Sequence, residues 1–281
     1  MKDVDVKLIN QIASDVKSGK LRLPSPPEFA QNLHEAIADE RRDISYVARI
    51  IQYDPGLTTR IIEIANSPLF RGKNEVVSCQ SAVTRIGMMT TRHYVYAFTL
   101  NNAFKSKNEF VNNKIREAWD DSRKIAILSF IIAEKISGMD PHRALMAGLV
   151  HNIGALPLLL YAEKSPSLLN DPSRLTMLID KVNAKLGTFV LTKWKFDKEL
   201  SSIPSEIDDW CRDPKPDADY ADIVNIARIY NAVGKPEFSE IPKMKDLPSF
   251  KKMPFSDKGP EACIETLKDA EMEMSVVMAL L

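Results

Sequence analysis

Apolar residues recur along most of this chain at the three- to four-residue spacing that is typical of amphipathic helices. Phe29, Leu33 and Ile37 lie four residues apart with polar residues between them, which places them on one face of a helix. No run shows the strict alternation or the density of β-branched side chains that is typical of a strand. The periodicity predicts helices over residues 27–38, 43–51, 54–67, 78–87, 90–104, 115–137, 140–152, 175–186, 187–194, 203–210 and 220–233. The sequence therefore predicts an all-α fold.

Short local signals mark where several of these helices begin and end. Asp-Pro pairs stand at Asp54-Pro55, Asp140-Pro141 and Asp171-Pro172. The aspartate can accept a hydrogen bond from an exposed backbone N–H, and proline at the first helical position removes an N–H that would have no partner there. Ser78 is a further candidate N-cap. Gly87 follows an apolar run and predicts a helix end in the left-handed conformation.

Changes in composition divide the chain into parts. We predict an N-terminal helix over residues 1–20 and a main domain over residues 21–233. Between Asn101 and Arg116 the apolar density falls while Asn, Lys and Ser accumulate, which indicates a bend at the surface. We therefore divide the main domain into a helical lobe, residues 21–112, and a second lobe, residues 113–233.

A proline-rich segment, residues 234–260, follows the main domain. Proline recurs there every six residues from Pro236 to Pro260, and a helix cannot propagate through this spacing. Two interpretations stay open: an extended strap that carries apolar anchors, and a long loop packed on the protein's own surface. Residues 261–281 predict an amphipathic helix, with Leu267 and Met274 among its apolar positions, that docks on the domain or on a partner.

The composition limits the class of protein. Of the 281 residues 44% are hydrophobic, which is enough to bury a sizeable core. Lys plus Arg and Asp plus Glu both number 38, so no overall field attracts nucleic acid or anionic lipid. Cys79, Cys211 and Cys263 are far apart in the sequence, which indicates reduced thiols and a cytoplasmic location.

The sequence gives no sign of export or of a membrane segment. The first residues include acids where a secretory signal has an apolar core. The longest apolar stretch, residues 125–133, lies between Lys124 and Glu134 and is shorter than the roughly 20 residues that cross a bilayer. We expect a buried helix there and no membrane partner.

Six short segments, in order, resemble the HDOD family, the HD-related output domain of bacterial signalling proteins, over about residues 21–233. They are Leu-Pro-Ser-Pro-Pro at 23–27, Ile-Gln-Tyr-Asp-Pro-Gly-Leu at 51–57, Ile-Ala-Asn-Ser-Pro-Leu-Phe at 64–70, Ser-Ala-Val-Thr-Arg-Ile-Gly at 81–87, Ala-Gly-Leu-Val-His-Asn-Ile-Gly at 147–154, and the Gly and Trp that bound 187–194. The residues that carry the matches are Asp54, Pro55, Asn66, Ser67, Gly87, Gly148, Gly154, Gly187 and Trp194.

The resemblance implies an HD-domain/PDEase-like helical bundle with an N-terminal helical lobe, a regulatory role, and no catalytic activity for most members. HD phosphohydrolases hold a metal with a histidine, an adjacent His-Asp pair and a later aspartate. By this resemblance Asp121 stands in place of the first histidine, His151 is kept, Asn152 replaces the aspartate of the pair, and Arg228, or Asn225, replaces the last aspartate. We call Asp121, His151, Asn152 and Arg228 the HD pocket, and we expect it to hold no metal or cofactor.

His151 is expected to be a hydrogen-bonded core residue whose partner is Asp121 or Asn152. If Asp121, His151 and Arg228 converge, they form either a salt-linked cluster or a small polar pocket for an anionic ligand. The other histidines are expected at the surface or partly buried. They are His34, His93 and His142.

Three functions compete. The first is a non-catalytic regulatory domain that binds another protein in a bacterial signal-transduction network. The second is a divergent phosphohydrolase that uses Asp121 and His151. The third is nucleic-acid binding, because lysines and aromatic residues interleave near residue 190, but the zero net charge disfavours it. The residues of that patch are Lys185, Phe189, Lys193, Trp194, Lys195, Phe196 and Lys198.

Overall fold

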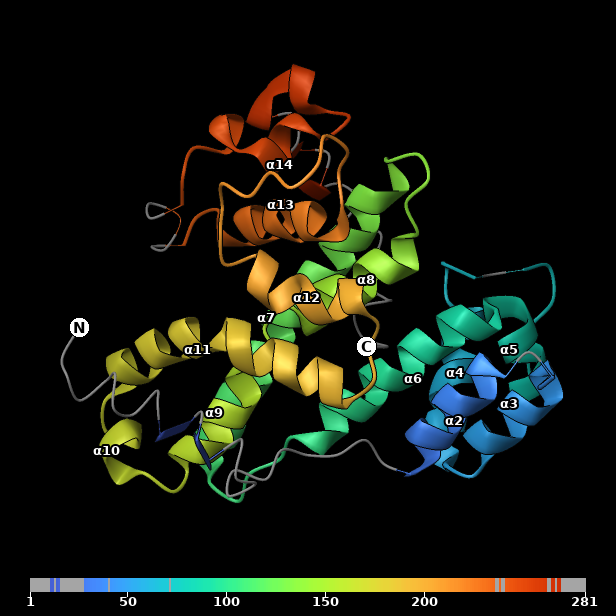
Figure 1. Ribbon diagram of the computed structural model, residues 1–281. Coiled ribbons are helices and arrows are strands. Elements are labelled where there is room, and N and C mark those ends of the chain that lie inside the picture. The colour runs from blue at the N-terminus through green and yellow to red at the C-terminus, as the bar shows by residue number, and fades with distance from the viewer. Residues whose placement is uncertain are drawn as a thin grey trace.

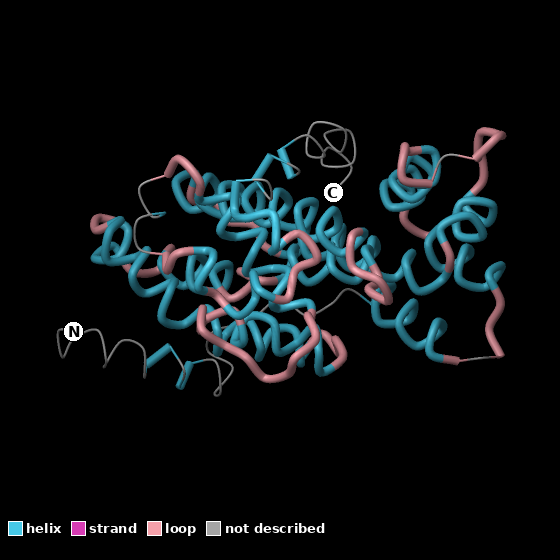
Figure 2. The backbone as a smooth tube through the Cα atoms, turned by 90° about the horizontal axis from the view of Figure 1, so that it is seen from above, coloured by secondary structure: helices cyan, strands magenta, loops and turns pink. Residues whose placement is uncertain are grey.

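The computed structural model describes residues 11–12, 14–15, 28–39, 41–70, 72–235, 238, 241–261, 264–265 and 267–268. Helices joined by short connections make up these ranges, and no strand occurs among them (Figure 2). The predicted all-α fold is confirmed.

Five helices span the family motifs between residues 51 and 87, whereas the motif at 23–27 lies outside the described residues. The helices are α2 (Glu28–Ala38), α3 (Ile44–Gln52), α4 (Pro55–Asn66), α5 (Cys79–Ile86) and α6 (Met88–Ala103). In Figures 1 and 2, α2 to α5 form a separate group at one end of the molecule, and α6 runs from this group into the remaining helices.

The second group is built around one long helix. Its members are α7 (Glu109–Glu134), α8 (Pro141–Val150), α9 (Ala155–Ala162), α10 (Pro166–Leu169), α11 (Pro172–Lys193), α12 (Lys198–Glu206) and α13 (Tyr220–Ala232). α7 packs against α8, α9 and α13. Every residue from Ile125 to Ala133 is buried, so the apolar stretch is a core helix as predicted.

Helix ends follow the local signals in the sequence. The side chains of Asp54, Asp140, Asp171 and Ser78 each accept a backbone N–H in the first turn of their helices. Each such cap contributes about 1 kcal/mol to helix stability. Gly87 ends α5 with φ of +86°, a conformation that costs any residue with a Cβ.

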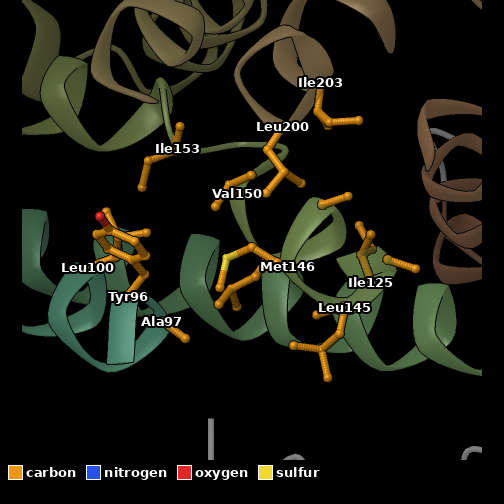
Figure 3. Close-up of a cluster of buried hydrophobic side chains, with 14 of the residues drawn as sticks. Tyr96, Ala97, Leu100, Ile125, Leu145, Met146, Val150, Ile153, Leu200 and Ile203 are labelled. Carbon is orange, nitrogen blue, oxygen red and sulfur yellow. The ribbon is translucent and has the colours of Figure 1, made fainter. Parts of the chain in front are cut away.

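Where the group α2–α6 meets the rest of the molecule, the core is continuous (Figure 3). Buried side chains converge there from α6, α7, α8 and α12 and from the turn after α8. Truncation of a side chain in such a core costs about 2–5 kcal/mol. The residues labelled in Figure 3 are Tyr96, Ala97, Leu100, Ile125, Leu145, Met146, Val150, Ile153, Leu200 and Ile203.

One stretch of the described chain passes a length and composition test for a membrane span. It covers Pro141–Ala162, 22 residues with a mean hydropathy of 1.6, but 83% of it is buried inside the protein. A core helix of a globular domain has the same composition, so this stretch is weak support for a membrane segment.

Several predicted helix boundaries are wrong. α7 begins at Glu109, capped by Asn108, and not at Ile115. The proposed boundary of the two lobes, between residues 112 and 113, therefore falls within this helix, and the division into lobes stays a prediction. α11 runs without interruption through Gly187, where two helices were predicted. α12 spans 198–206 and not 203–210, because Asp197 caps it. Helices α9 and α10 were not predicted.

The proline-rich segment is not an extended strap. It forms single helical turns at η2 (Met244–Asp246), α14 (Pro248–Lys251) and η3 (Ser256–Lys258). Pro248 opens α14, and Pro242 and Pro254 each stand two residues before one of the other turns. The spacing of the prolines prevents a longer helix. The apolar residues between the prolines point inward, so the alternative of a segment packed on the protein itself is the correct one. The buried residues are Met244, Leu247, Phe250 and Met253.

Ion pairs hold this segment on α13. The ammonium of Lys252 lies 2.8 Å from an oxygen of Asp213 and 3.2 Å from one of Asp222. Arg212 pairs with both Asp219 and Asp222 at 2.8 Å. The predicted helix over residues 1–20 lies almost entirely outside the described residues, as does most of the helix predicted over residues 261–281.

Candidate functional site

His151 caps the C-terminal end of α8 and is buried. Its Nδ1 lies 2.7 Å from the carbonyl oxygen of Gly148. Because a carbonyl can only accept, Nδ1 carries the proton and Nε2 keeps the lone pair. The prediction that Asp121 or Asn152 is the hydrogen-bond partner of His151 is therefore wrong. Burial, and then the charge of Arg228, lower the pKa of His151 to about 4, so the imidazole is neutral at pH 7.

Arg228 on α13 holds a fixed positive charge near His151. Its Nη1 donates to the carbonyl oxygen of Ile207 at 2.6 Å and to Oδ1 of Asn225 at 3.0 Å. The guanidinium also lies 4.3 Å from the ring centroid of Trp210, an attractive cation–π distance. Burial lowers the pKa of Arg228 to about 10, so the group remains cationic at neutral pH.

Asp121 on α7 is not placed as a metal ligand. Its side chain is 50% exposed, and its Oδ1 lies 3.5 Å from the ammonium of Lys235 and 3.5 Å from Nδ2 of Asn231. Its charge still reaches His151, but as the weakest of the influences on the pKa of that group. Asn152 is half-buried, and its backbone carbonyl accepts the N–H of Ala155 at 3.1 Å.

The HD pocket residues therefore share one neighbourhood without forming a ligand set. His151, Arg228 and Asp121 interact through their charges, but each has its hydrogen bonds elsewhere. Within the described part of the chain, no three His, Cys, Asp or Glu side chains gather in a group that could hold a metal ion.

Three family-motif glycines set the backbone around His151. A Cβ at Gly148 would lie 2.6 Å from the Cα of Ala126 on α7, one at Gly154 would lie 2.6 Å from the N of Gly187, and one at Gly187 would lie 2.7 Å from the Cβ of Pro204. Real Cβ atoms do not approach so closely. Any side chain at these positions would separate α7 from α8, or α9 from α11 and α12.

The remaining family-motif residues serve the fold. Asn66 brackets Val76 with two hydrogen bonds to its backbone, at 2.8 and 2.9 Å, and Arg85 donates to the last carbonyls of α4 at Ala65. Ser67 is buried, but its hydroxyl has no partner among the described residues. Trp194 is 1% exposed. These residues position helices.

The burial of the other three histidines was predicted correctly for His34 and His142 but not for His93. His34 and His142 are half-buried, and His142 stacks on Phe70 with ring centroids 4.8 Å apart. His93 is only 4% exposed, so its predicted position at or near the surface is wrong. Helix α6 is buried on most of its circumference around this residue, which the apolar spacing did not indicate.

Two residues that fix the pocket, Trp210 and Asn183, were not predicted from the sequence, and the role of a third, Gly148, was not predicted either. Gly148 contributes a backbone oxygen, Trp210 an aromatic face, and Asn183 a side-chain amide that donates to the carbonyl of His151 at 3.2 Å. Asn225 was the alternative candidate at its position, and it holds Arg228. Gly148, as a family-motif residue, and Asn225 had a signal in the sequence, whereas the contacts of Trp210 and Asn183 join separate segments.

Comparisons with known proteins agree with this architecture. The HDOD domain model matches residues 23–208. A protein from Shewanella amazonensis SB2B, provisionally named a metal-dependent phosphohydrolase, is 26% identical, with a TM-score of 0.79 over 96% of this chain and 98% of that one. An HDOD domain protein of unknown function from Geobacter sulfurreducens is 19% identical, with a TM-score of 0.66 over 98% and 96% of the two chains.

A third structure is that of a provisionally named signal transduction protein from Marinobacter aquaeolei VT8. It is 18% identical, with a TM-score of 0.66, and the similarity covers 92% of this chain but 59% of that one. No curated protein matches the chain.

Proposed function

The chain belongs to the HDOD family, and from this we propose that it is a non-catalytic regulatory domain that binds another protein in a bacterial signal-transduction network. Its fold is shared with a provisionally named signal transduction protein, over 59% of that longer chain. A domain of this kind transmits a signal by contact, so its function depends on a stable surface and not on turnover.

The observation that carries the proposal is the fixed guanidinium of Arg228. Two hydrogen bonds and an aromatic face hold it, and its charge already disfavours protonation of His151. A divalent cation near the same imidazole would meet the same repulsion. A catalytic ion also needs at least three protein donors and an activated water, whereas Asp121 is engaged by Lys235.

The catalytic part is tested with purified protein and an activated phosphodiester, in the presence of Mn²⁺ or Zn²⁺. We expect the wild type and His151→Ala to show the same background hydrolysis. Hydrolysis that disappears in His151→Ala would contradict the proposal. Arg228→Lys, which keeps the positive charge, is the matched control for changes in folding.

The binding part is tested by capture from the native cytosol, followed by reconstitution from two purified components. We expect one captured protein to form a complex of defined stoichiometry with the chain in calorimetry. If no captured protein binds in reconstitution, protein–protein interaction is not its mode of action.

A divergent phosphohydrolase is the second candidate, and one observation favours it. His151 donates Nδ1–H to a backbone carbonyl and keeps Nε2 free, which is the tautomer that metal-ligating histidines adopt. Elemental analysis of the purified protein decides between the two. Stoichiometric iron, manganese or zinc that is lost in His151→Ala would support the enzyme, and a metal content well below one per chain would support the regulatory domain.

We further propose that the protein acts in the cytoplasm and binds neither membranes nor nucleic acid. Cys79 and Cys211 are free thiols, as a reducing compartment requires. Trp194 is buried, and of the aromatic residues in the patch only Phe189 is exposed, at 42%, so one ring is available where single-stranded nucleic acid uses several aromatic side chains for stacking. Retention on DNA or RNA that falls with salt would contradict this part.

A further inference from the structure

A cavity that none of the HD pocket residues line lies where α2 and α6 face the connection between α11 and α12. Its volume is about 100 Å³. In Figure 1 the C-terminal end of α11 points toward α6 and α2. Side chains of both helix groups form the walls, and we call it the α6–α11 cavity. The residues used below are His34, Arg92, His93, Tyr96, Lys195 and Phe196.

His93 is the central observation. It is 4% exposed, it lines the cavity, and neither Nδ1 nor Nε2 has a hydrogen-bond partner among the described residues. Nδ1 of His34, on the facing helix, is likewise buried and without a partner there. Buried polar groups are nearly always satisfied, and an orphaned one requires an explanation such as a bound molecule. Two orphaned imidazoles on one cavity point to an occupant.

The charge around the cavity defines what that occupant is. The guanidinium of Arg92 makes no hydrogen bond and no ion pair within the described residues, and its charge lowers the pKa of both His34 and His93, after burial, which has the larger effect. Lys195 adds a second positive charge, paired only loosely with Glu35 at 3.4 Å and largely exposed.

One carboxylate, Asp197, also lines the cavity, and its charge acts on Arg92 without a hydrogen bond, because its Oδ1 has hydrogen-bond donors of its own. It accepts hydrogen bonds from Arg143 at 2.6 Å and from the N–H of Leu200 at 3.2 Å. The positive charge of Arg92 is therefore left without a hydrogen-bonded counter-charge at the cavity wall. An anion is the ligand class that this charge balance favours.

The backbone at Lys195 is strained in a way that serves the cavity. Its φ of +58° is the only positive φ among the described residues other than glycine. The N–H of Lys195 bonds to the carbonyl of Thr192 and that of Phe196 to the carbonyl of Leu191, both at 3.0 Å. This is a Schellman ending, in which the left-handed position is usually glycine.

Lysine at this position costs stability that glycine would not. In return, the turn places a cation at the rim of the cavity and Phe196 against Tyr96, with ring centroids 4.8 Å apart. Strained residues of this kind gather at binding sites, because the surrounding structure maintains them there.

We infer that the α6–α11 cavity binds a phosphate-sized oxyanion, either free or as the phosphate group of a small molecule, through Arg92, His93, His34 and Lys195. The volume equals that of about three water molecules, which suits one tetrahedral anion. Arginine binds phosphate with two parallel N–H donors, and each neutral imidazole supplies one N–H. The donors come from three segments around the cavity, and this arrangement suits a tetrahedral anion better than a flat carboxylate.

The consequence is a link between the two helix groups. His34, Arg92 and His93 belong to α2 and α6, whereas Lys195 follows α11. A bound anion would be held by both and would stabilise their arrangement. This inference does not depend on the HD pocket, so either of the two functions proposed for that pocket can fail without affecting it.

The test uses the full chain and inorganic phosphate, with sulfate, acetate and chloride at matched ionic strength. We expect phosphate, and sulfate more weakly, to raise the melting temperature by about 2 °C or more at saturation, and chloride and acetate to have no such effect. If a phosphate monoester binds at least tenfold more tightly than inorganic phosphate, the natural ligand is a small molecule that carries a phosphate group. Equal shifts with phosphate and chloride would overturn the inference.

Two variants separate binding from folding. Arg92→Gln should weaken phosphate binding at least tenfold in calorimetry. Lys195→Gly should raise the melting temperature of the free protein, because it relieves the backbone, and should still weaken phosphate binding. Lys193→Gln, at an exposed position on the same helix end, removes the same charge and should bind like the wild type. Unchanged affinity in both Arg92→Gln and Lys195→Gly would overturn the inference.

A direct readout is available because the chain has 4 histidines. With ¹⁵N-labelled histidine, phosphate should shift the ring signals of His93 and His34 and leave those of His151 unchanged. Shifts confined to histidines outside the cavity would place the anion elsewhere and contradict the assignment.

Discussion

His151 and His93 are both buried imidazoles whose pKa is lowered to about 4, mainly by burial, but their surroundings differ. His151 donates to a carbonyl of its own helix, and its cationic neighbour, Arg228, is held by two oxygens and an aromatic ring. His93 has no hydrogen-bond partner among the described residues, and its neighbour Arg92 interacts with the carboxylate of Asp197 through charge alone. At His151 the Nδ1–H is bonded within the protein, whereas at His93 neither ring nitrogen is, and a cavity with positive charge adjoins it.

The site that carries the family motif and the site that has unsatisfied polar groups are therefore different. Family resemblance draws attention to the HD pocket, where the chain itself supplies hydrogen-bond partners for Nδ1 of His151 and for Arg228. The α6–α11 cavity has no motif, and only its unsatisfied groups reveal it. Buried groups that are left without partners are therefore the better guide to a ligand here.

The largest expected effect is the loss of stability in acid, which involves both histidines. Each has a folded pKa near 4 below the unfolded value of about 6.5, so the unfolded chain binds more protons between these limits. Stability is full above pH 6.5 and falls as the pH approaches 4. At pH 5 the loss is on the order of 2 kcal/mol for each histidine.

Urea unfolding at pH 7.5 and pH 5 measures this loss. The charged and titratable neighbours are Arg92, Asp140, Arg143 and His142 for His93, and Arg228 and Asp121 for His151. His93→Gln and His151→Gln should each remove about half of the pH dependence. A midpoint that does not change between the two pH values would show that the imidazoles are not buried.

The second prediction breaks the HD pocket alone. Gly154→Ala places a Cβ 2.6 Å from the N of Gly187, so α9 and α11 must move apart. We expect a loss of about 3 kcal/mol in the free energy of unfolding. Gly56→Ala is the matched control, because its Cβ would meet no heavy atom closer than 3.3 Å and alanine favours a helix. The folded fraction of Gly154→Ala should still bind phosphate. Loss of phosphate binding in this variant would show that the α6–α11 cavity depends on the structure of the HD pocket.

The sequence allowed much of the fold to be predicted, because its helices begin with local chemistry. Asp54, Asp140 and Asp171 cap helices where the Asp-Pro pairs stand, and these contacts span only a few residues. Asn108 and Asp197 are equally good caps but lack the adjacent proline, and the starts of α7 and α12 were misplaced accordingly.

The sites were less predictable, because their contacts join distant segments. Arg228 meets Trp210 across the loop before α13, and His93 on α6 faces Lys195 beyond α11 in one cavity. Nor can a sequence show that a backbone oxygen, that of Gly148, takes the hydrogen bond of His151. Apolar spacing indicates which face of a helix is buried but not which polar group on it lacks a partner.

The smallest expected effect tests how firmly the HD pocket holds its cation. Trp210→Ala removes the aromatic face below Arg228 and should cost about 1 kcal/mol, measured by thermal or urea unfolding. Tyr53→Ala is a suitable control, since that aromatic side chain is 85% exposed and its loss should be close to neutral. A cost at Trp210 no greater than at Tyr53 would mean that Arg228 is held by its hydrogen bonds alone.

The most direct test of the central claim, that the HD pocket no longer works as a metal site, is anomalous X-ray scattering from crystals grown with Mn²⁺ or Zn²⁺. We predict no anomalous peak within coordination distance of Nε2 of His151, because Arg228 repels a cation there and Asp121 pairs with Lys235. A strong peak bound by Nε2 and at least two further side chains would contradict the account.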